Sequence, residues 1–253
     1  HEDPQGNLWV GTFGGGLNKF DPRAKTFTAF RHDVDDPNTL SSDRVTAILG
    51  TESGQLWIGT DGGGLNLFDP ATGSARRFQH DPLDPTSLPV DTVCALFTDR
   101  FGTLWVGTRG GGLSKMIGEP SELLEPTFLS YGEADGLPNS VVYAIQPDAD
   151  GALWLSTNHG LSRFDPMAMT FTNFDASDGL QANEFNFGAS YRNADGELFF
   201  GGINGYNALA PAAPTGSRTD TLDRGRGSEH RNRRASRSRR GVNTGSAELT
   251  TGF

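Results

Sequence analysis

The chain has 253 residues, a formal net charge of −10 and 34 glycines. Its hydrophobic content of 35% can bury a sizeable core, and the glycine excess is typical of a chain with many tight turns. No run of about 18 apolar residues occurs, so we expect no direct insertion into a membrane. The single cysteine, Cys94, excludes an internal disulfide framework.

The charge is unevenly distributed along the chain. Residues 1–211 carry 12 Lys and Arg against 27 Asp and Glu, whereas residues 212–253 carry 9 Arg against 4 acidic residues. An acidic surface repels the phosphate backbone, so we expect the repeats described next not to bind nucleic acid.

A short apolar phrase recurs at nearly constant spacing through residues 1–211. It reads Leu-Trp-Val-Gly-Thr at residues 8–12, and versions of it return at 56–60, 104–108, 153–157 and 198–202. The aromatic anchors of these five phrases are Trp9, Trp57, Trp105, Trp154 and Phe199. A period of this length, with short apolar runs between glycine-rich turns, is typical of a β-propeller.

Each repeat reads as four antiparallel strands joined by turns. In the repeat of residues 45–80 we expect strands at 45–49, 56–59, 65–68 and 75–78, followed by a longer link to the next repeat. The first repeat lacks an inner strand and the last shows no outer strand, which gives about 18 strands in all. The units span approximately residues 1–31, 45–80, 93–131, 142–174 and 185–211.

The sequence therefore predicts an all-β protein, a β-propeller of about five four-stranded blades. Because a closed five-bladed ring needs about 20 strands, we interpret the chain as an arc of a larger, seven-bladed ring. A closed five-bladed ring is the alternative. The aromatic anchors, on second strands flanked by apolar residues, are expected to be buried between neighbouring blades.

Residues 212–253 differ sharply from the repeats. This segment is rich in Arg, Ser and Gly, with Phe253 as its one aromatic residue, and buries too little apolar surface to offset the entropy of ordering. We expect it to be a disordered tail. Its composition is what an out-of-frame reading of a GC-rich gene would produce.

The repeated phrases resemble a known family. Leu-Trp-Ile-Gly-Thr at 56–60, Gly-Gly-Gly-Leu at 62–65, Phe-Asp-Pro at 68–70 and the link at 80–88 resemble the two-component regulator propeller repeat, and 183–189 with 201–205 resemble its last blade. The resemblance implies a periplasmic or extracytoplasmic sensor region of a bacterial histidine kinase, hybrid two-component system or diguanylate cyclase. The β-sandwich, transmembrane helix and signalling domains that usually follow in the family are not visible in this sequence.

The resemblance implies a non-catalytic, ligand-sensing role in a transmembrane signalling receptor. Kinase or cyclase domains would lie outside this chain, and no cofactor is expected. The implied partners are a small molecule, for which the family suggests an oligosaccharide, the rest of the receptor and its dimer mate. A propeller enzyme, either a lyase or a glycosidase, and a protein-interaction scaffold are the alternatives.

The candidate ligand site consists of residues that vary within otherwise repeated turns. In an antiparallel meander, the turns between second and third strands share one rim with the links between blades, so their variable side chains can converge. These residues, which we expect to bind the ligand, are Phe13, Asp61, Arg109, Asn158, His159 and Asn204.

Other motifs favour structural roles. His32-Asp33 and His80-Asp81 occupy equivalent positions in successive repeats, so we expect both pairs to hold the links in place. The turn at 148–151 has a fragment of calcium-loop spacing, but equivalent turns elsewhere argue against any metal site. For an enzyme, Glu184, Asp61 and His159 would be the acid–base candidates.

Overall fold

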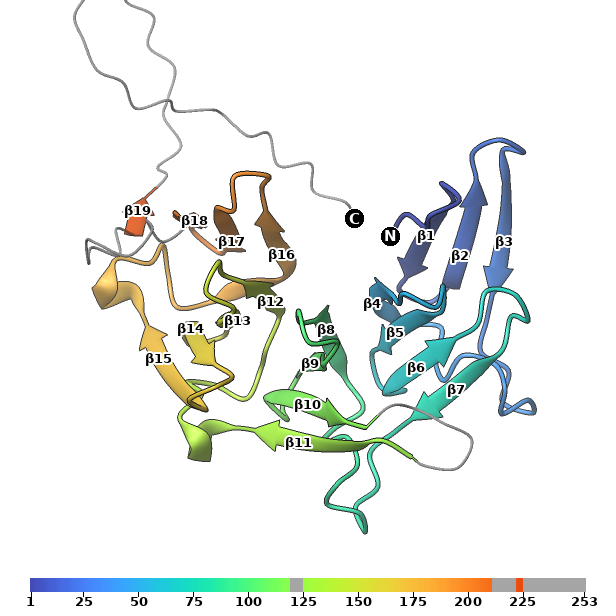
Figure 1. The fold of residues 1–253 in the computed structure, drawn as a ribbon, viewed down its shortest axis with the longest axis horizontal. Coiled ribbons are helices and arrows are strands. Elements are labelled where there is room, and N and C mark those ends of the chain that lie inside the picture. Colours follow the sequence, from blue (N-terminus) through green and yellow to red (C-terminus); the bar gives the residue numbers. More distant parts are fainter. Residues whose placement is uncertain (119–124, 211–221, 225–253) are drawn as a thin grey trace, which may run out of the picture.

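The computed structural model describes residues 1–118, 125–210 and 222–224, and it consists of five antiparallel sheets. The first sheet has three strands and each of the others has four, and in all five the strands follow one another in chain order (Figure 1). We call these sheets blades 1 to 5. Their strands are β1 (Leu8–Thr12), β2 (Gly16–Asp21) and β3 (Thr26–Phe30) in blade 1; β4 (Val45–Gly50), β5 (Leu56–Thr60), β6 (Leu65–Phe68) and β7 (Ala75–Phe78) in blade 2; β8 (Val93–Thr98), β9 (Leu104–Thr108), β10 (Leu113–Ile117) and β11 (Thr127–Tyr131) in blade 3; β12 (Ala144–Pro147), β13 (Leu153–Thr157), β14 (Gly160–Asp165) and β15 (Thr170–Phe174) in blade 4; and β16 (Phe185–Arg192), β17 (Leu198–Gly202), β18 (Gly205–Leu209) and β19 (Leu222–Arg224) in blade 5.

The blades stand around a common centre, with the first strand of each four-stranded sheet innermost (Figure 1). The arrangement confirms the predicted all-β propeller of about five blades. Two single-turn 3₁₀ helices, η1 (Glu133–Asp135) and η2 (Ala176–Asp178), lie in the links before blades 4 and 5. Within the described ranges, no helix combines the length and apolar character needed to cross a membrane.

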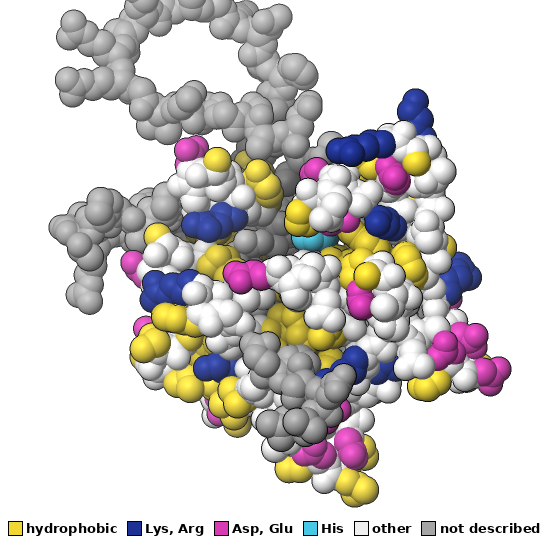
Figure 2. All heavy atoms as spheres, turned by 45° about the vertical axis from the view of Figure 1, so that its right-hand side comes forward, with side chains coloured by type: hydrophobic (Ala, Val, Ile, Leu, Met, Phe, Trp, Pro, Cys, Tyr) yellow, Lys and Arg dark blue, Asp and Glu magenta, His cyan; other side chains and the backbone are white. Residues whose placement is uncertain are grey.

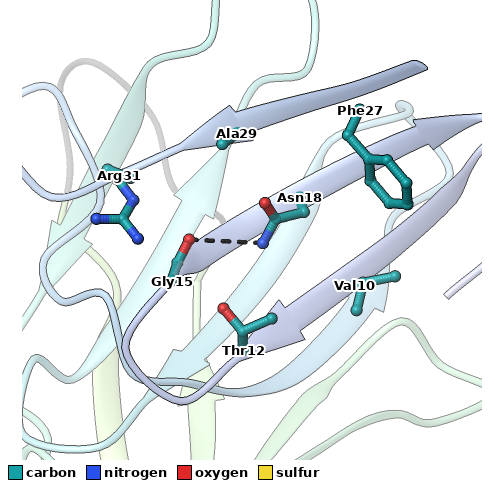
Figure 3. Close-up of a pocket in the computed structure, with 7 residues that line it drawn as sticks. All are labelled: Val10, Thr12, Gly15, Asn18, Phe27, Ala29 and Arg31. Atoms are coloured by element: carbon teal, nitrogen blue, oxygen red, sulfur yellow. Dashed lines mark hydrogen bonds between the residues drawn. The ribbon is translucent and has the colours of Figure 1, made fainter.

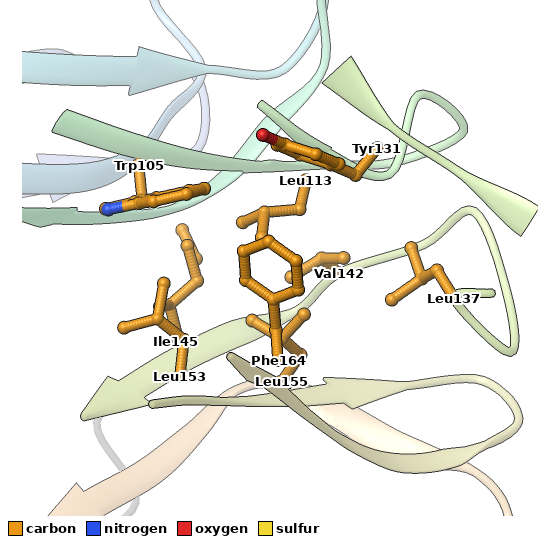
Figure 4. Packing of buried hydrophobic residues seen from close by; sticks show 10 residues of the cluster. Trp105, Leu113, Tyr131, Leu137, Val142, Ile145, Leu153, Leu155 and Phe164 are labelled. Atoms are coloured by element: carbon orange, nitrogen blue, oxygen red, sulfur yellow. The ribbon is translucent and has the colours of Figure 1, made fainter. Parts of the chain in front are cut away.

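The core is divided into four apolar clusters, one at each junction between consecutive blades. At the junction of blades 3 and 4, Trp105 and Leu113 face Leu155 and Phe164 (Figure 4). The Trp105 and Phe164 rings meet edge to face with centroids 5.6 Å apart, a favourable arrangement for aromatic pairs. No cluster of described residues joins blade 5 to blade 1, so the five blades form an arc that lacks a packed closing junction.

Successive side chains of the second strand point to opposite faces of the blade, so each repeated phrase packs into two junctions. Trp57 packs toward blade 3, while its neighbours Leu56 and Ile58 point to the opposite face and pack against blade 1. The next residue, Gly59, lets the inner strand of blade 3 approach, because a Cβ on it would lie 2.6 Å from Val93 Cγ1. The buried Thr60 closes the turn by donating its hydroxyl to Gly64 O at 2.8 Å.

The first blade exposes a face that is covered in every other blade. Val10 is 43% exposed, whereas the equivalent Ile58, Val106, Leu155 and Phe200 are fully buried. Val10 and Phe27 lie side by side over a shallow hollow of about 430 Å³ (Figure 3). This open face agrees with the interpretation of the chain as an arc.

Two sequence-based expectations require correction at blade 5. The four tryptophan anchors are buried, but Phe199 is only half-buried, because no further blade among the described residues covers its side of blade 5, and its ring contacts the exposed Tyr191 instead. The count of 18 strands was one too few, since β19 pairs with β18. This strand lies in the predicted disordered tail. Backbone pairing at a sheet edge does not require apolar side chains, whereas the prediction of disorder rests on their scarcity in this segment. The rest of that prediction concerns residues outside the described ranges.

We expect Trp57→Ala to lower the free energy of unfolding by about 3–5 kcal/mol, because it empties the junction of blades 2 and 3. Urea denaturation followed by circular dichroism measures this loss. The matched control is Phe27→Ala, which removes an aromatic ring that is 68% exposed and should cost less than about 1 kcal/mol. Equal losses for the two variants would contradict the assignment of Trp57 to the core.

Candidate functional site

The turns between second and third strands lie on one rim, against the links that lead to the next blade. Gly62 N and Gly64 N both donate to Asp91 O, at 3.1 and 2.8 Å. Gly110 N and Gly112 N make the same pair of bonds to Ser140 O, at 2.9 and 2.8 Å. This repeated attachment confirms that turns and links share a rim, as the meander predicts, and it fixes the backbone on which the variable side chains stand.

The first variable residues meet through Arg44, which directly precedes β4. The Arg44 guanidinium lies over the Phe13 ring, with its carbon 4.1 Å from the ring centroid. The same guanidinium forms an ion pair with the Asp61 carboxylate at 2.5 Å. The Phe13 residue is 68% exposed and the Arg44 side chain 50%, but the Asp61 side chain only 14%. Phe13 and Arg44 therefore face solvent, and Asp61 holds Arg44 from beneath.

The row continues into blade 3. Thr92 Oγ1 donates to Asp61 Oδ1 at 3.3 Å, and Arg109 N donates to Thr92 O at 2.9 Å. The Arg109 guanidinium lies close to the Cys94 thiol. Burial raises the pKa of that thiol to about 11, with the Asp61 charge acting in the same direction and Arg109 opposing it. We call this set, Phe13, Arg44, Asp61, Thr92, Cys94 and Arg109, the mouth row.

The structure does not join the other three candidates to the mouth row. His159 lies close enough to Asp175, in the next link, to help lower the pKa of that carboxyl group. The main cause of the lowered pKa is a hydrogen bond from the Ser177 side chain. Asn204 is bound to the same link, where its backbone N–H donates to Gln181 Oε1 at 2.7 Å. Asn158 is exposed. Within the described ranges, no hydrogen bond or ion pair connects these residues to Phe13, Asp61 or Arg109.

The two His-Asp pairs have the structural role expected from their repetition. His32 Nδ1 lies 2.7 Å from Leu40 O, and His80 Nδ1 lies 2.8 Å from Leu88 O. The backbone N–H of His80 also donates to Asp91 Oδ1 at 2.7 Å. Both histidines therefore bind the links at equivalent points.

Charge and metal-binding groups are dispersed rather than concentrated. On the face shown in Figure 2, basic and acidic side chains are interspersed, with apolar side chains visible between them. Among the described residues, no group of three or more His, Cys, Asp or Glu side chains could hold a metal ion. In the turn at residues 148–151, Asp148 accepts from Arg163 Nε at 2.7 Å.

Arg44, Thr92 and Cys94 are not among the site residues predicted from the sequence, because that prediction rests on the turns alone. A signal was present, since Arg44, Thr92 and Val141 each stand 13 residues before a tryptophan anchor and differ from one another. They are thus variable members of a repeated position, by the same criterion that selected Asp61 and Arg109. What the sequence alone did not show is that this position pairs with the variable turn of the preceding blade.

Comparison with known proteins agrees with this architecture. The family model described as two component regulator propeller matches three segments, residues 39–62, 87–110 and 136–159. Each segment contains the end of a link, the first two strands of a blade and the start of the variable turn. The chain is therefore a β-propeller repeat protein. The matched segments lie in blades 2, 3 and 4, whose repeats are similar to the two component regulator propeller family.

The chain is similar to three known proteins. "Histidine kinase P4" of Formosa agariphila is 32% identical over 77 residues, which are 30% of this chain and 6% of the kinase. The extracellular domain of BT4673 from B. thetaiotaomicron, described as a one component system, matches with a TM-score of 0.69 and 24% identity over 84% of this chain and 29% of that one. The extracellular domain of BT3049 from the same organism, described as a hybrid two component system, matches with a TM-score of 0.59 and 22% identity over 88% of this chain and 37% of that one. At these identities the structural likeness shows the fold alone, and the chain spans well under half of each relative.

We expect Cys94 to resist alkylation by iodoacetamide in the folded protein at pH 8. The thiol is buried, and its pKa of about 11 leaves little of the reactive thiolate at that pH. Mass spectrometry should show labelling of the chain in urea but not in buffer. Rapid labelling of the folded chain would contradict the placement of Cys94 beneath Arg109.

Proposed function

We propose that this chain is part of the extracytoplasmic sensing region of a bacterial signalling receptor, and that the mouth row is its ligand-binding site. The observation that carries the proposal is the convergence of Phe13, Asp61 and Arg109, the variable residues of three successive turns, into one connected row. A fixed backbone that presents a different side chain in each blade can build a specific site. The two component regulator propeller repeats support the signalling context.

The exposed chemistry of the mouth row suits a polyhydroxylated or anionic small molecule. The Phe13 ring offers an apolar surface for stacking, and the Arg44 and Arg109 guanidiniums offer fork-shaped pairs of donors. Two cations against the single Asp61 carboxylate leave the row with one net positive charge. Asp61 acts on the ligand through Arg44, which it orients. An oligosaccharide is compatible with this chemistry.

We propose that the site is non-catalytic. The acid–base candidates lie in separate surroundings, since Asp61 is paired with Arg44 while His159 is beside Asp175. The Glu184 backbone carbonyl accepts from Ile203 N at 3.3 Å, which places this residue at the turn of blade 5. Retaining and inverting glycosidases need two carboxyl groups at a defined separation across the substrate, and these contacts supply no such pair.

In a receptor, ligand binding would shift the balance between two arrangements of a dimer. Asn158, His159 and Asn204 remain proposed contacts from blades 4 and 5, for a ligand long enough to span the mouth. The dimer mate and the remaining receptor domains are proposed partners.

The test is calorimetry with a panel of neutral sugars, acidic sugars and small organic acids. For any compound that binds, Arg109→Ala should weaken binding by about 1–3 kcal/mol, the cost of losing a charge-assisted hydrogen bond. The fold should be unchanged because the Arg109 side chain is exposed.

The control is Gln55→Ala, which alters a turn on the opposite rim and should leave binding unchanged. If a compound binds equally well to Arg109→Ala, Asp61→Ala and His159→Ala, its site lies elsewhere and the proposed role of the mouth row is wrong.

A further inference from the structure

A second recess lies on the opposite rim, between blades 3 and 4. It is a groove of about 540 Å³, within the size range of small-molecule sites. Its walls are the turns at residues 99–103 and 148–151, together with the turn that follows β14. Arg192, at the end of β16, adds a contribution from blade 5. None of these residues belongs to the mouth row.

One wall carries an aromatic residue where other repeats carry polar ones. Phe101 is 70% exposed at the tip of its turn, and the matching residues of blades 1, 2, 4 and 5 are Gln5, Ser53, Asp150 and Asp195. The exposed Met167 lines the same groove. Exposed apolar side chains that line a recess are typical of ligand contact rather than of core packing.

The preceding residue, Arg100, lies between the turns of blades 3 and 4. Its guanidinium carbon lies 4.9 Å from the centroid of the Phe101 ring. On the other side it approaches the turn of blade 4, where a Cβ on Gly151 would be 3.4 Å from the same carbon. Arg100 therefore reaches from its own turn in blade 3 to the turn of blade 4.

Basic and acidic side chains line the groove in equal numbers, but the acidic ones already have hydrogen-bond or ion-pair partners within the protein. Asp99 accepts from Trp105 Nε1 at 2.9 Å and from two backbone N–H groups, and Asp165 accepts from two further backbone N–H groups. Asp148 and Asp150 both pair with Arg163, at 2.7 and 3.6 Å. These carboxylates are thus occupied by the protein's own donors.

Three cations of the groove have no such partner. Within the described ranges, Arg100, Lys115 and Arg192 form no ion pair, although Lys115 lies 5.6 Å from the centre of the Trp105 ring. Guanidinium and ammonium groups without an ion-pair partner can pair with an anion that enters a recess, and guanidiniums bind a carboxylate through paired hydrogen bonds. The groove carries four basic and four acidic side chains, whereas the repeats as a whole are acidic.

We infer that this groove is a second binding site, selective for a small organic anion that joins a carboxylate to a flat apolar body. The carboxylate lies between Arg100 and Arg192, with Lys115 nearby, and the apolar body rests against Phe101 and Met167. The site is separate from the mouth row, so the inference stands whether or not that row binds a ligand.

The probe is 2-naphthoate, titrated calorimetrically into the complete 253-residue chain, with the neutral 2-naphthamide as its isostere. We expect naphthoate to bind at least about tenfold more tightly than the amide, and Arg100→Ala or Arg192→Ala to weaken naphthoate binding by about tenfold. Phe101→Ser, which installs the residue of blade 2, should also weaken binding. Circular dichroism and urea midpoints confirm that these surface variants are folded.

Two further variants make the result specific. Arg23→Ala removes an exposed positive charge from the same rim on blade 1 and should bind naphthoate as the unmodified chain does. Arg109→Ala removes a positive charge from the mouth row and shows whether naphthoate binds there instead. The inference is overturned if naphthoate fails to bind at millimolar concentration, if the amide binds equally well, or if Arg100→Ala and Arg192→Ala bind with unchanged affinity. A loss in Arg109→Ala alone would move the binding to the mouth row.

Discussion

The structure depends on one constraint: a blade is too thin to bury its own apolar side chains and must cover them with its neighbours. All four apolar clusters therefore lie between blades rather than within them. The repeated phrase contributes to two junctions at once, because successive side chains of a strand point to opposite faces: Trp57 packs in one junction and Ile58 in the other. The same constraint explains why Val10 and Phe199, at the two ends of the arc, are exposed or half-buried although their equivalents are buried.

The scaffold and the sites use different parts of each repeat. Buried threonines, turn glycines and link histidines recur because each closes a turn or ties a link at the same point in successive blades. The positions that vary lie where two such fixed segments meet, at the rim. There Arg44 contacts both Phe13 and Asp61, so one side chain connects the turns of two blades. A ligand at this rim would therefore touch several blades at once.

The sequence predicted the features that repetition controls. The strand pattern, the burial of the four tryptophans and the role of His32 and His80 follow from a period that places equivalent residues in equivalent environments. It did not predict contacts between different positions of different repeats, and so missed the Arg44–Asp61 pair and the groove beside Phe101. Composition was also misleading for β19, because backbone pairing is independent of apolar content.

The most direct test of this account compares one substitution at two equivalent positions. Leu56 and Leu8 both precede a tryptophan anchor, but Leu56 is 2% exposed at the junction with blade 1, whereas Leu8 is 42% exposed. If stability resides in the junctions, Leu56→Ala should lower the free energy of unfolding in urea by about 2–5 kcal/mol and Leu8→Ala by less than about 1 kcal/mol. Losses of similar size at the two positions would show that the blades are stabilised individually and would contradict the account.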